Sequence, residues 1–391
     1  MNICFVTAEY PPMQGGVGDC TRELGRALIQ LGHTVAVISS STGVTAPESR
    51  NPSEPAVQRV VRRWDWTCWG QVLRTVRTLH SEVLHVQYQA AAYGMHPAIN
   101  FLPLRARFLS TRPRVVVTFH DLRVPYLFPK AGRVRGWVNQ QLARWSDAVI
   151  ATNIEDFQCL QAANLPSSSV LIPIGSNIPP RLPVGYDRAS WRRALGVADD
   201  DVLLCYFGFL NESKGGETLL RSLAELRHRG QRARLLMVGG QVGDSDPTNR
   251  VYLERIRRLA NELMLGGSVL WTGFGPKEQV SAHFRAADIC VLPYRDGASY
   301  RRGSFMAALA HGLPIVSTQP KVSIATLIHG ENIFLVPPDD AAAVADAVEQ
   351  VVGAPALRSR LAAGALELAK QFAWDTIATQ TARLYAQLVA A

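Results

Sequence analysis

Two adjacent arginines, Arg301 and Arg302, precede a predicted helix that begins near Gly303–Ser304 and ends at Gly312. The apolar run Ile289–Pro293 comes before them and predicts a buried parallel strand. The free N–H groups at the start of a helix bind anions, and a guanidinium group matches the oxygens of a phosphate. This stretch therefore predicts a site for a phosphorylated ligand.

A second predicted turn from strand to helix supplies a lysine. The segment Gly208–Gly215 (GFLNESKG) follows the predicted strand Asp201–Phe207 and opens a helix at Gly216. Lys214 stands where a flexible ammonium group can reach a phosphate. Standing alone, this segment would more simply hold a solvated lysine at a helix start.

A histidine follows another apolar strand directly. His120 and Asp121 come after Val115–Phe119, and the carboxyl end of a parallel strand is where ligands bind in open α/β sheets. At this position His120 can hydrogen-bond a hydroxyl group or share a proton. The alternative is a loop histidine capped by its neighbour, and its position slightly favours the functional interpretation.

Several common chemistries lack their motifs. The cluster Gly15–Gly18 stands six residues beyond the first strand, and the second strand ends in three serines rather than an acid, so a dinucleotide fingerprint is not met. We expect these glycines to let a backbone loop approach a ligand across the cleft. There is no GxSxG elbow, HExxH pair or Walker loop. Asp244–Asp246 and Asp199–Asp201 resemble polar turns, and we expect no metal at either.

Composition predicts a globular protein of two domains. The chain has 391 residues, is 47% hydrophobic and 19% charged, and contains no run of eighteen apolar residues. Its six scattered cysteines form no CxxC pair, and the N-terminus has no basic leader, which favours a cytoplasmic location.

The net charge of +9 is uneven, because residues 1–180 hold 17 Lys and Arg against 11 Asp and Glu. Solubility alone explains this positive charge, and contact with an anionic membrane or an anionic acceptor explains it equally. No nucleic-acid-binding signature occurs, so we do not expect nucleic acid as a partner. In Arg62–Trp69 (RRWDWTCW) we expect tryptophans buried on a core helix, with a membrane interface or an acceptor groove as the alternative.

Apolar runs alternate with helical patterns in both halves, and a proline-rich segment, Ile178–Gly185, separates them. This alternation predicts an α/β protein with two doubly wound Rossmann-type domains, with ligands bound in the cleft between them. The predicted parts are residues 1–180, residues 181–371 and a final helical segment, residues 372–391.

The order of these segments resembles the GT-B-fold glycosyltransferases of group 1, the retaining family-four enzymes. The likeness spans nearly the whole chain, and it rests on AEYPPMQGGVG, FHD, IPIGSN, FGFLNESKG, WTGFGPKE, FRAADICVLP, AHGLPIVST and the closing FAWDTIATQTARLYAQLV. Each motif alone is loose, but their order and spacing make a chance match improbable.

The resemblance implies transfer of a sugar from a nucleotide-diphosphate donor to a hydroxyl acceptor, with retention, without metal and with no separate cofactor. The acceptor would be a glycan, a polysaccharide or a lipid-linked sugar. In family terms, Lys214 and the helix start at Gly303 and Ser304 hold the diphosphate, Gly208 belongs to the donor site, and Gly273 and Phe274 lie near the base. The first domain, with Gly16, His120 and Asp121, would face the transferred sugar and the acceptor, and the last helix would pack back on it.

The sequence departs from the family in three positions. The usual pair of glutamates would stand at Ser299 and Ala307, and the usual arginine of the lysine turn is replaced by Phe209. We hypothesise compensation, in which Arg301 or Arg302 neutralises the leaving diphosphate together with Lys214. Asp296 is then a candidate to contact the hydroxyl groups of the donor. A catalytically inactive nucleotide-sugar-binding protein and a nucleotide-sugar epimerase are the alternatives.

Overall fold

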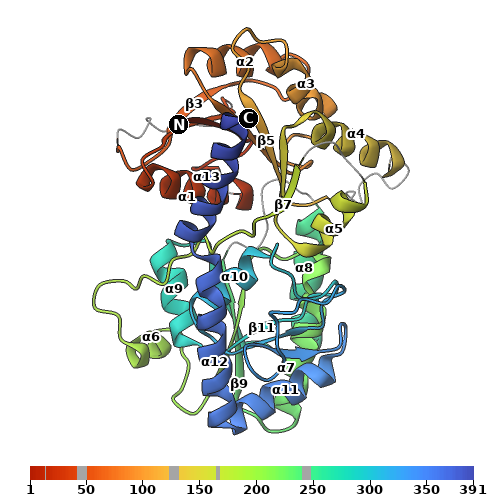
Figure 1. Cartoon of the computed structure of the whole chain (residues 1–391). Coiled ribbons are helices and arrows are strands. Elements are labelled where there is room, and N and C mark those ends of the chain that lie inside the picture. Colours follow the sequence, from red (N-terminus) through yellow and green to blue (C-terminus); the bar gives the residue numbers. More distant parts are fainter. Residues whose placement is uncertain (14, 42–50, 123–131, 164–167, 240–247) are drawn as a thin grey trace. The chain divides into compact units, whose positions relative to one another are not determined.

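The computed structural model describes residues 1–13, 15–41, 51–122, 132–163, 168–239 and 248–391. The chain forms two compact units: unit 1 is Met1–Gly175 with Ala373–Ala391, and unit 2 is Ser176–Phe372 (Figure 1). The predicted boundary at residue 180 and the predicted separate segment, residues 372–391, differ from this division, because unit 2 begins at Ser176 and Ala373–Ala391 belongs to unit 1. The chain passes to unit 2 just before the proline-rich segment.

Unit 1 is built on a seven-stranded sheet with the order β3-β2-β1-β4-β5-β6-β7, and every pairing in it is parallel. Its strands are β1 (Asn2–Val6), β2 (Thr34–Ser40), β3 (Ala56–Val61), β4 (Val83–Tyr88), β5 (Arg114–Phe119), β6 (Ala148–Ala151) and β7 (Ser168–Leu171). Strand β3 was not predicted, because this half-exposed edge strand carries polar residues and has no continuous apolar run.

Helices cover both faces of this sheet, as the alternation of strands and helices predicted. They are α1 (Gly16–Gln30), α2 (Cys68–Thr78), η1 (Pro97–Phe101), α3 (Leu102–Ala106), α4 (Gly132–Trp145), α5 (Ile154–Ala162) and α13 (Trp374–Ala390). Helices α1 and α13 share a core with one face of the sheet, and α2 to α5 cover the other.

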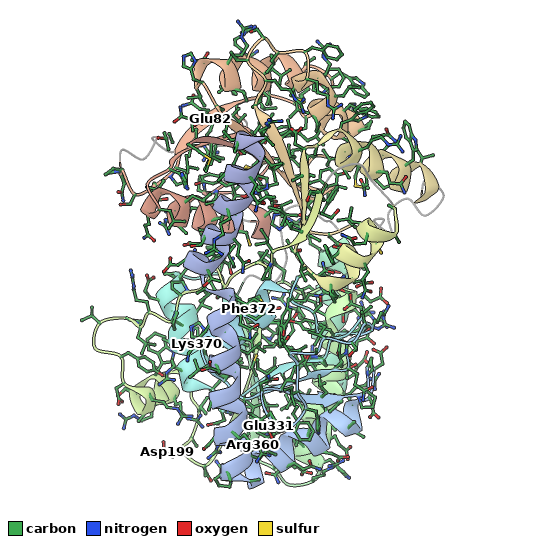
Figure 2. The ribbon with its side chains drawn as sticks, in the orientation of Figure 1. Glu82, Asp199, Glu331, Arg360, Lys370 and Phe372 are labelled. Atoms are coloured by element: carbon green, nitrogen blue, oxygen red, sulfur yellow. The ribbon has the colours of Figure 1, made fainter. Side chains whose placement is uncertain are left out.

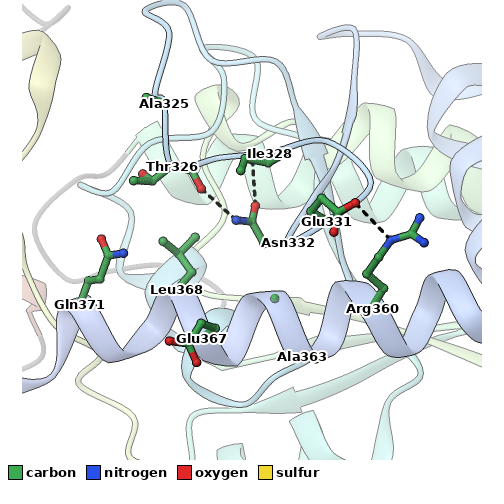
Figure 3. Close-up of a pocket in the computed structure, with 11 residues that line it drawn as sticks. Ala325, Thr326, Ile328, Glu331, Asn332, Arg360, Ala363, Glu367, Leu368 and Gln371 are labelled. Atoms are coloured by element: carbon green, nitrogen blue, oxygen red, sulfur yellow. Dashed lines mark hydrogen bonds and ion pairs between the residues drawn. The ribbon is translucent and has the colours of Figure 1, made fainter.

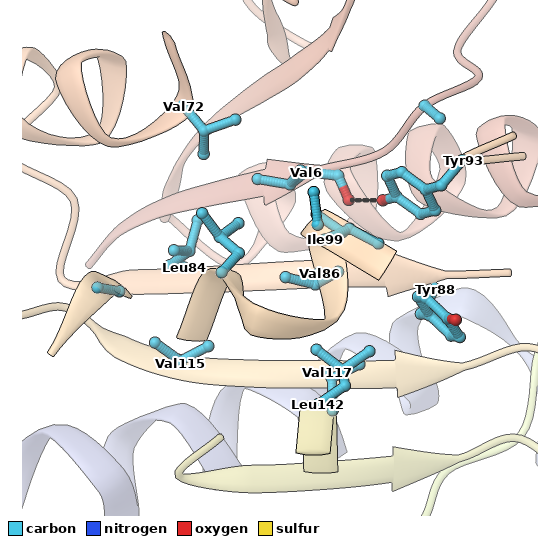
Figure 4. Close-up of a cluster of buried hydrophobic side chains, with 14 of the residues drawn as sticks. Val6, Val72, Leu84, Val86, Tyr88, Tyr93, Ile99, Val115, Val117 and Leu142 are labelled. Carbon is cyan, nitrogen blue, oxygen red and sulfur yellow. Dashed lines mark hydrogen bonds between the residues drawn. The ribbon is translucent and has the colours of Figure 1, made fainter. Parts of the chain in front are cut away.

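The two faces follow from the period of two along each strand. Figure 4 shows Val6, Val86 and Val117 from three adjacent strands packing with Leu142 of α4, all fully buried. The same cluster is fastened by the hydroxyl of Tyr93, which donates to the Val6 carbonyl at 3.0 Å. On the other face of the sheet, the last helix, α13, buries Tyr385 in the core that it shares with α1, and this makes α13 an integral part of unit 1.

Unit 2 contains a six-stranded sheet with the order β10-β9-β8-β11-β12-β13, again wholly parallel. The strands are β8 (Val202–Phe207), β9 (Ala233–Val238), β10 (Val269–Gly273), β11 (Ile289–Leu292), β12 (Ile315–Thr318) and β13 (Phe334–Val336). Strand β13 was not predicted, since three residues are too few to show a period. The helical segments are α6 (Arg188–Ala194), η3 (Glu212–Lys214), α7 (Gly216–His228), α8 (Thr248–Glu262), α9 (Lys277–Ala286), α10 (Gly303–Ala310), α11 (Ala341–Gly353), α12 (Pro355–Ala369) and η4 (Lys370–Phe372).

No helix in the described part of the chain is both long enough and apolar enough to cross a membrane. Five of the six cysteines are buried, none is in a disulfide, and Cys159 is exposed.

Candidate active site

The carboxyl edge of the unit 2 sheet gathers most of the predicted donor residues. Strands β10, β9, β8 and β11 are consecutive in this sheet and run parallel, so their carboxyl ends meet at one edge. Gly273 ends β10, Gly208 follows β8, and the arginine loop follows β11. Because neighbouring strands lie about 4.8 Å apart, the ends of β8 and β10 are separated by about 10 Å.

The lysine turn depends on a close approach of two loops. Gly215 has a φ of +69°, and a Cβ atom built on it would lie 1.8 Å from the carbonyl oxygen of Pro293. Only glycine fits at such a position. The backbone N–H of Arg295 also donates to the Ser213 carbonyl at 2.9 Å. The loop after β8 is thereby held against the loop after β11, and Lys214 is brought to the arginines.

Asp296 joins the two arginines of the second loop. Arg302 donates to both carboxylate oxygens of Asp296 at 2.6 Å, and Arg301 donates to Oδ2 at 2.7 Å. The three side chains are largely buried, with exposed fractions of 5% for Arg301, 13% for Arg302 and 8% for Asp296. The carboxylate that we expected at the donor hydroxyls is thus already bound by two guanidinium groups.

Arg302 contacts both loops at once. It donates to the hydroxyl of Ser213 at 3.2 Å, and its guanidinium group lies over the Tyr294 ring, 5.1 Å from the centroid. The phenol of Tyr294 is itself 2.6 Å from the hydroxyl of Ser304. This network couples the arginine, the lysine turn and the start of α10.

Lys214 lies within the same network. A Cβ atom on Gly208 would lie 3.2 Å from Nζ of Lys214 and 3.5 Å from Cβ of Ser304. Burial, assisted by the positive charge of Arg302, lowers the pKa of Lys214 to about 7. Three basic groups and one carboxylate give the cluster an excess of positive charge, which an anion would neutralise.

The N-terminus of α10 adds backbone donors to this cluster. Arg302 is its N-cap residue and makes no capping hydrogen bond with its side chain. Ser304 is buried in the first turn, where the N–H groups carry the positive end of the helix dipole. Helix start, Lys214 and Arg302 therefore all present positive charge to one place.

The positions predicted near a base lie farther along the same edge. Gly273 has a φ of +71° and forms an isolated bridge with Gly239 at the end of β9. Phe274 follows it and is 68% exposed. An exposed aromatic ring at this edge offers a face on which a planar base can stack.

His120 is part of a hydrogen-bonded chain within unit 1. Its Nε2 lies 2.8 Å from Oε1 of Gln87, whose amide nitrogen lies 3.3 Å from Nε2 of His85. Nδ1 of His85 is 2.5 Å from the hydroxyl of Tyr385 on α13. These contacts assign the proton of neutral His120 to Nε2 and leave its Nδ1 as an acceptor.

Burial keeps both histidines neutral. It lowers the pKa of His120 to about 4, and it lowers that of His85 to about 3 with help from His120. His120 also lines a small pocket that includes Cys20, Thr152 and Trp374. The half-buried Asp121 follows it directly. Sequence reasoning missed Gln87, although the spacing of His85 and Gln87 in an otherwise apolar strand marks two polar groups on one face.

One glycine of the unit 1 cluster, Gly18, is required by the close approach of the protein's own backbone. A Cβ on Gly18 would lie 2.7 Å from the carbonyl oxygen of Glu9, whereas a Cβ on Gly16 would meet nothing within 4 Å. Close approach therefore explains Gly18, not Gly16, which is the first residue of α1. The carboxylate of Glu9, which sequence reasoning also missed, accepts from the N–H of Val17 at 3.3 Å. Burial raises the pKa of Glu9.

The structure describes one of the two acidic runs at which we expect no metal. Asp200 and Asp201 pair with Arg232, and Asp201 also pairs with Arg234, so this run belongs to a surface ion-pair network. The run Asp244–Asp246 lies outside the described residues. Within the ranges that the structure covers, no group of three or more His, Cys, Asp and Glu side chains is arranged to hold a metal ion.

A separate open pocket of about 650 Å³ lies between α12 and the segment 325–332 (Figure 3). Glu331 and Arg360, which are labelled in Figure 2, form an ion pair of 3.6 Å at one end of it. The hydroxyl of Thr326, in its wall, is 2.5 Å from that of Tyr300, which precedes the arginines. None of the predicted donor residues lines this pocket.

Comparison with known proteins agrees with this geometry. A family model described as "Glycosyl transferases group 1" matches residues 201–353, and one described as "Glycosyltransferase Family 4" matches residues 14–177. The first match covers all strands of the unit 2 sheet, β8 to β13, and the second covers β2 to β7 of the unit 1 sheet, so that β1 lies outside it. The chain belongs to the GT-B-fold glycosyltransferases of group 1.

Relatives with known names carry several activities. A D-inositol 3-phosphate glycosyltransferase of Nocardioides sp. is 29% identical over 65% of this chain and 56% of that protein. Glycogen synthase of Mycobacterium tuberculosis is 26% identical over 98% of this chain and 94% of its own. A GDP-mannose-dependent alpha-(1-6)-phosphatidylinositol monomannoside mannosyltransferase of the same organism is 25% identical over 97% of both chains.

Solved structures share the whole architecture. Sucrose-phosphate synthase from Thermosynechococcus elongatus matches with a TM-score of 0.79 at 24% identity, over 100% of this chain and 99% of that one. The Anabaena protein HepE in complex with UDP-glucose matches with a TM-score of 0.77 at 18% identity, over 99% and 100%. These matches confirm two Rossmann-type domains of the GT-B class.

Proposed function

We propose that this glycosyltransferase moves a hexosyl group from a nucleotide-diphosphate sugar to a hydroxyl acceptor, with retention and without metal. The observation that carries the proposal is the convergence of Lys214, Arg302 and the N-terminus of α10. A leaving diphosphate develops negative charge, and positive groups fixed in advance stabilise that charge. Such a cluster also explains how the site tolerates Ser299 and Ala307 where glutamates are usual.

We assign distinct roles to the cluster. Lys214, Arg302, the Ser304 side chain and the N–H groups of Gly303 and Ser304 bind the diphosphate. Arg301 acts through Asp296, because that carboxylate orients both guanidinium groups. Gly208 lets Lys214 approach, since a side chain there would crowd the ammonium group.

We assign the remaining residues to the base and to the transferred sugar. Phe274, beside Gly273, stacks on the base. In unit 1, Nδ1 of neutral His120 accepts a hydrogen bond from a sugar hydroxyl, with Asp121 beside it and Gly16, at the start of α1, facing the sugar. This role for His120 follows from its hydrogen bond to Gln87, which leaves Nδ1 as the acceptor.

The acceptor that we propose is a glycan, a polysaccharide or a lipid-linked sugar of the cell envelope. Two relatives are named as a glycogen synthase and a phosphatidylinositol monomannoside mannosyltransferase, which supports acceptors of these classes. We place the enzyme in the cytoplasm, with peripheral contact to an anionic membrane. The positive charge of residues 1–180 is in keeping with such contact.

The proposal is tested by thermal stability of the full chain against a panel of nucleotide diphosphates and nucleotide sugars without metal. A ligand at a hundredfold excess over its Kd stabilises the folded state by about 2.7 kcal/mol. This corresponds to a rise in Tm of about 5 °C or more for a domain of this size. Absence of a shift with every member of the panel would refute the donor site.

Variants assign the shift to the cluster. Lys214→Ala and Arg302→Ala should each weaken binding about 10- to 100-fold, because each removes a charged hydrogen-bond donor. Lys370→Ala and Arg258→Ala are matched controls, since both residues are exposed and stand outside the cluster. If all four variants bound the donor equally, our assignment would be wrong.

Turnover separates the alternatives once a donor is known. Transfer to an added acceptor supports the proposed function, and NMR of the new anomeric centre tests retention. Conversion of the donor alone identifies an epimerase. Binding without turnover across a range of acceptors identifies a catalytically inactive binding protein.

A further inference from the structure

One surface of unit 1 carries large aromatic side chains that its fold does not bury. It is formed by the turn before α2, by η1, α3 and α4, which lie together in Figure 1. The exposed fractions are 48% for Trp66, 54% for Trp137 and 74% for Phe108. We expected the tryptophans of residues 62–69 to be buried on a core helix, and for Trp66 that expectation is wrong.

These side chains form one continuous patch. The rings of Trp66 and Trp69 are 5.0 Å apart, those of Trp66 and Phe101 are 6.1 Å apart, and Trp137 follows at 6.0 Å from Phe101. Arg105 extends the patch to Phe108, because its guanidinium group lies 5.7 Å from the Trp69 ring and 6.0 Å from that of Phe108. We call these six residues the aromatic patch.

Two further observations anchor the patch and extend it. The indole N–H of Trp69 donates to the Ala98 carbonyl at 2.9 Å, so the polar atom of this half-buried ring is satisfied and its edge is fixed. Val134 stands three residues before Trp137 on α4 and is 64% exposed. Residues three apart lie on the same helix face, so Val134 adds an aliphatic side chain beside the patch.

Positive charge surrounds the patch. The described stretches 62–114 and 134–147 contain ten arginines and three acidic residues, Asp65, Glu82 and Asp147, of which Asp147 pairs with Arg112. Arg62, Arg63, Arg105 and Arg107 are all exposed. A symmetric pairing of two copies through this face would bring arginines against arginines, which disfavours self-association.

We propose that the aromatic patch and its arginines dock unit 1 on the surface of an anionic lipid bilayer. Tryptophan and phenylalanine rings partition into the boundary between head groups and acyl chains, and arginines bind the anionic head groups. This combination of exposed rings and surplus positive charge matches that surface better than it matches a nucleic acid. Bases need open aromatic faces to stack on. In this patch the guanidinium group of Arg105 lies over the rings of Trp69 and Phe108. The ring planes of Trp66 and Trp69 meet at an angle of 73°.

Flotation of the full chain with vesicles tests the proposal. Vesicles of phosphatidylcholine mixed with phosphatidylglycerol should bind the protein, vesicles of phosphatidylcholine alone should bind it far more weakly, and high salt should reduce the binding. Each arginine near an anionic surface is worth about a fivefold change in partition. The variant R63E/R107E should therefore bind at least about 25-fold more weakly.

The rings are tested separately. W137S/F108S should also reduce binding, and bromine-labelled lipids should quench the tryptophan fluorescence of the wild type more than that of Trp137→Phe. The matched controls in unit 2 are V251S/M264S, at residues that are 69% and 89% exposed, and R193E/R258E, at two exposed arginines. Both controls should bind vesicles as the wild type does.

Several results would overturn the proposal. These are equal binding by the patch variants and the wild type, equal loss in the control variants, or tighter binding to single-stranded nucleic acid than to anionic vesicles. Loss of a dimer in R63E/R107E would instead identify a second copy of the chain as the occupant. The patch variants should keep the Tm and the donor-induced shift of the wild type, so this test is independent of the donor site.

Discussion

The lowered pKa of Lys214 predicts that donor affinity depends on pH. The free enzyme holds this lysine with a pKa of about 7, because the site is buried and Arg302 lies nearby. The group is therefore charged below pH 7 and loses its proton above it. A bound diphosphate favours the charged form, so binding above pH 7 takes up a proton.

The size of the effect follows from the titration of one group. If the protonated lysine is the form that binds, the apparent Kd should rise about 50-fold between pH 7 and pH 9. At pH 8, about 0.9 proton should be taken up for each donor bound. A nucleotide sugar is the best ligand, because its diphosphate is esterified at both ends and does not titrate in this range.

Isothermal titration calorimetry measures both quantities, since buffers of different ionisation enthalpy report the proton uptake. Lys214→Met should bind more weakly at pH 7 and should lose the dependence on pH, whereas the exposed control Lys370→Met should retain both properties of the wild type. A wild-type Kd that changes less than about threefold between pH 7 and pH 9 would refute the reasoning. So would an unchanged dependence in Lys214→Met.

Three further predictions concern stability and metal. Gly215→Ala should lower the free energy of unfolding by at least about 3 kcal/mol, because its Cβ would overlap the Pro293 carbonyl, whereas Gly230→Ala, with a similar φ and open space, should cost about 1 kcal/mol in chemical denaturation. Burial opposes ionisation of Glu54, but hydrogen bonds from two arginines outweigh it and lower its pKa to about 2. Glu54→Gln should therefore cost about 1–2 kcal/mol in urea unfolding at pH 7, allowing for arginines that are each about a third exposed. This difference should shrink as the pH falls from 4.5 towards 2, and a constant difference would contradict the assignment. Removal of divalent cations with EDTA should leave the Kd of the donor unchanged, and a tenfold loss that Mg²⁺ restores would show that metal supplies the charge instead.

The elements of the fold were readable from the sequence because each has a local cause. A short apolar run such as Ile289–Pro293 predicts a strand that is buried on both faces of a parallel sheet. The helices between such strands have one apolar side that packs on the sheet. The two strands that were missed, β3 and β13, lack that local signal. One is a polar edge and the other has three residues, so only their partners in the sheet define them.

The candidate site was predictable in its membership but not in its contacts. Lys214 and Arg302 stand out in sequence because they flank helix starts. That they meet at all depends on Gly215 packing on Pro293, a contact between loops that lie about eighty residues apart. The position of Asp296 between Arg301 and Arg302 likewise depends on the local path of a loop without regular structure.

The two α/β domains, the family and the identity of the cations follow from local features of the sequence, because periodicity, glycine turns and residue type act locally. The tertiary structure alone decided the protonation states and the partners. Lys214 has a low pKa because other parts of the chain bury it, and His85 is neutral in a chain that runs from His120 to Tyr385, 300 residues beyond His85. The tertiary structure also leaves Trp66 and Trp137 exposed, with the Phe101 ring near both of them. Burial and proximity are properties of the assembled fold, and no local pattern encodes them.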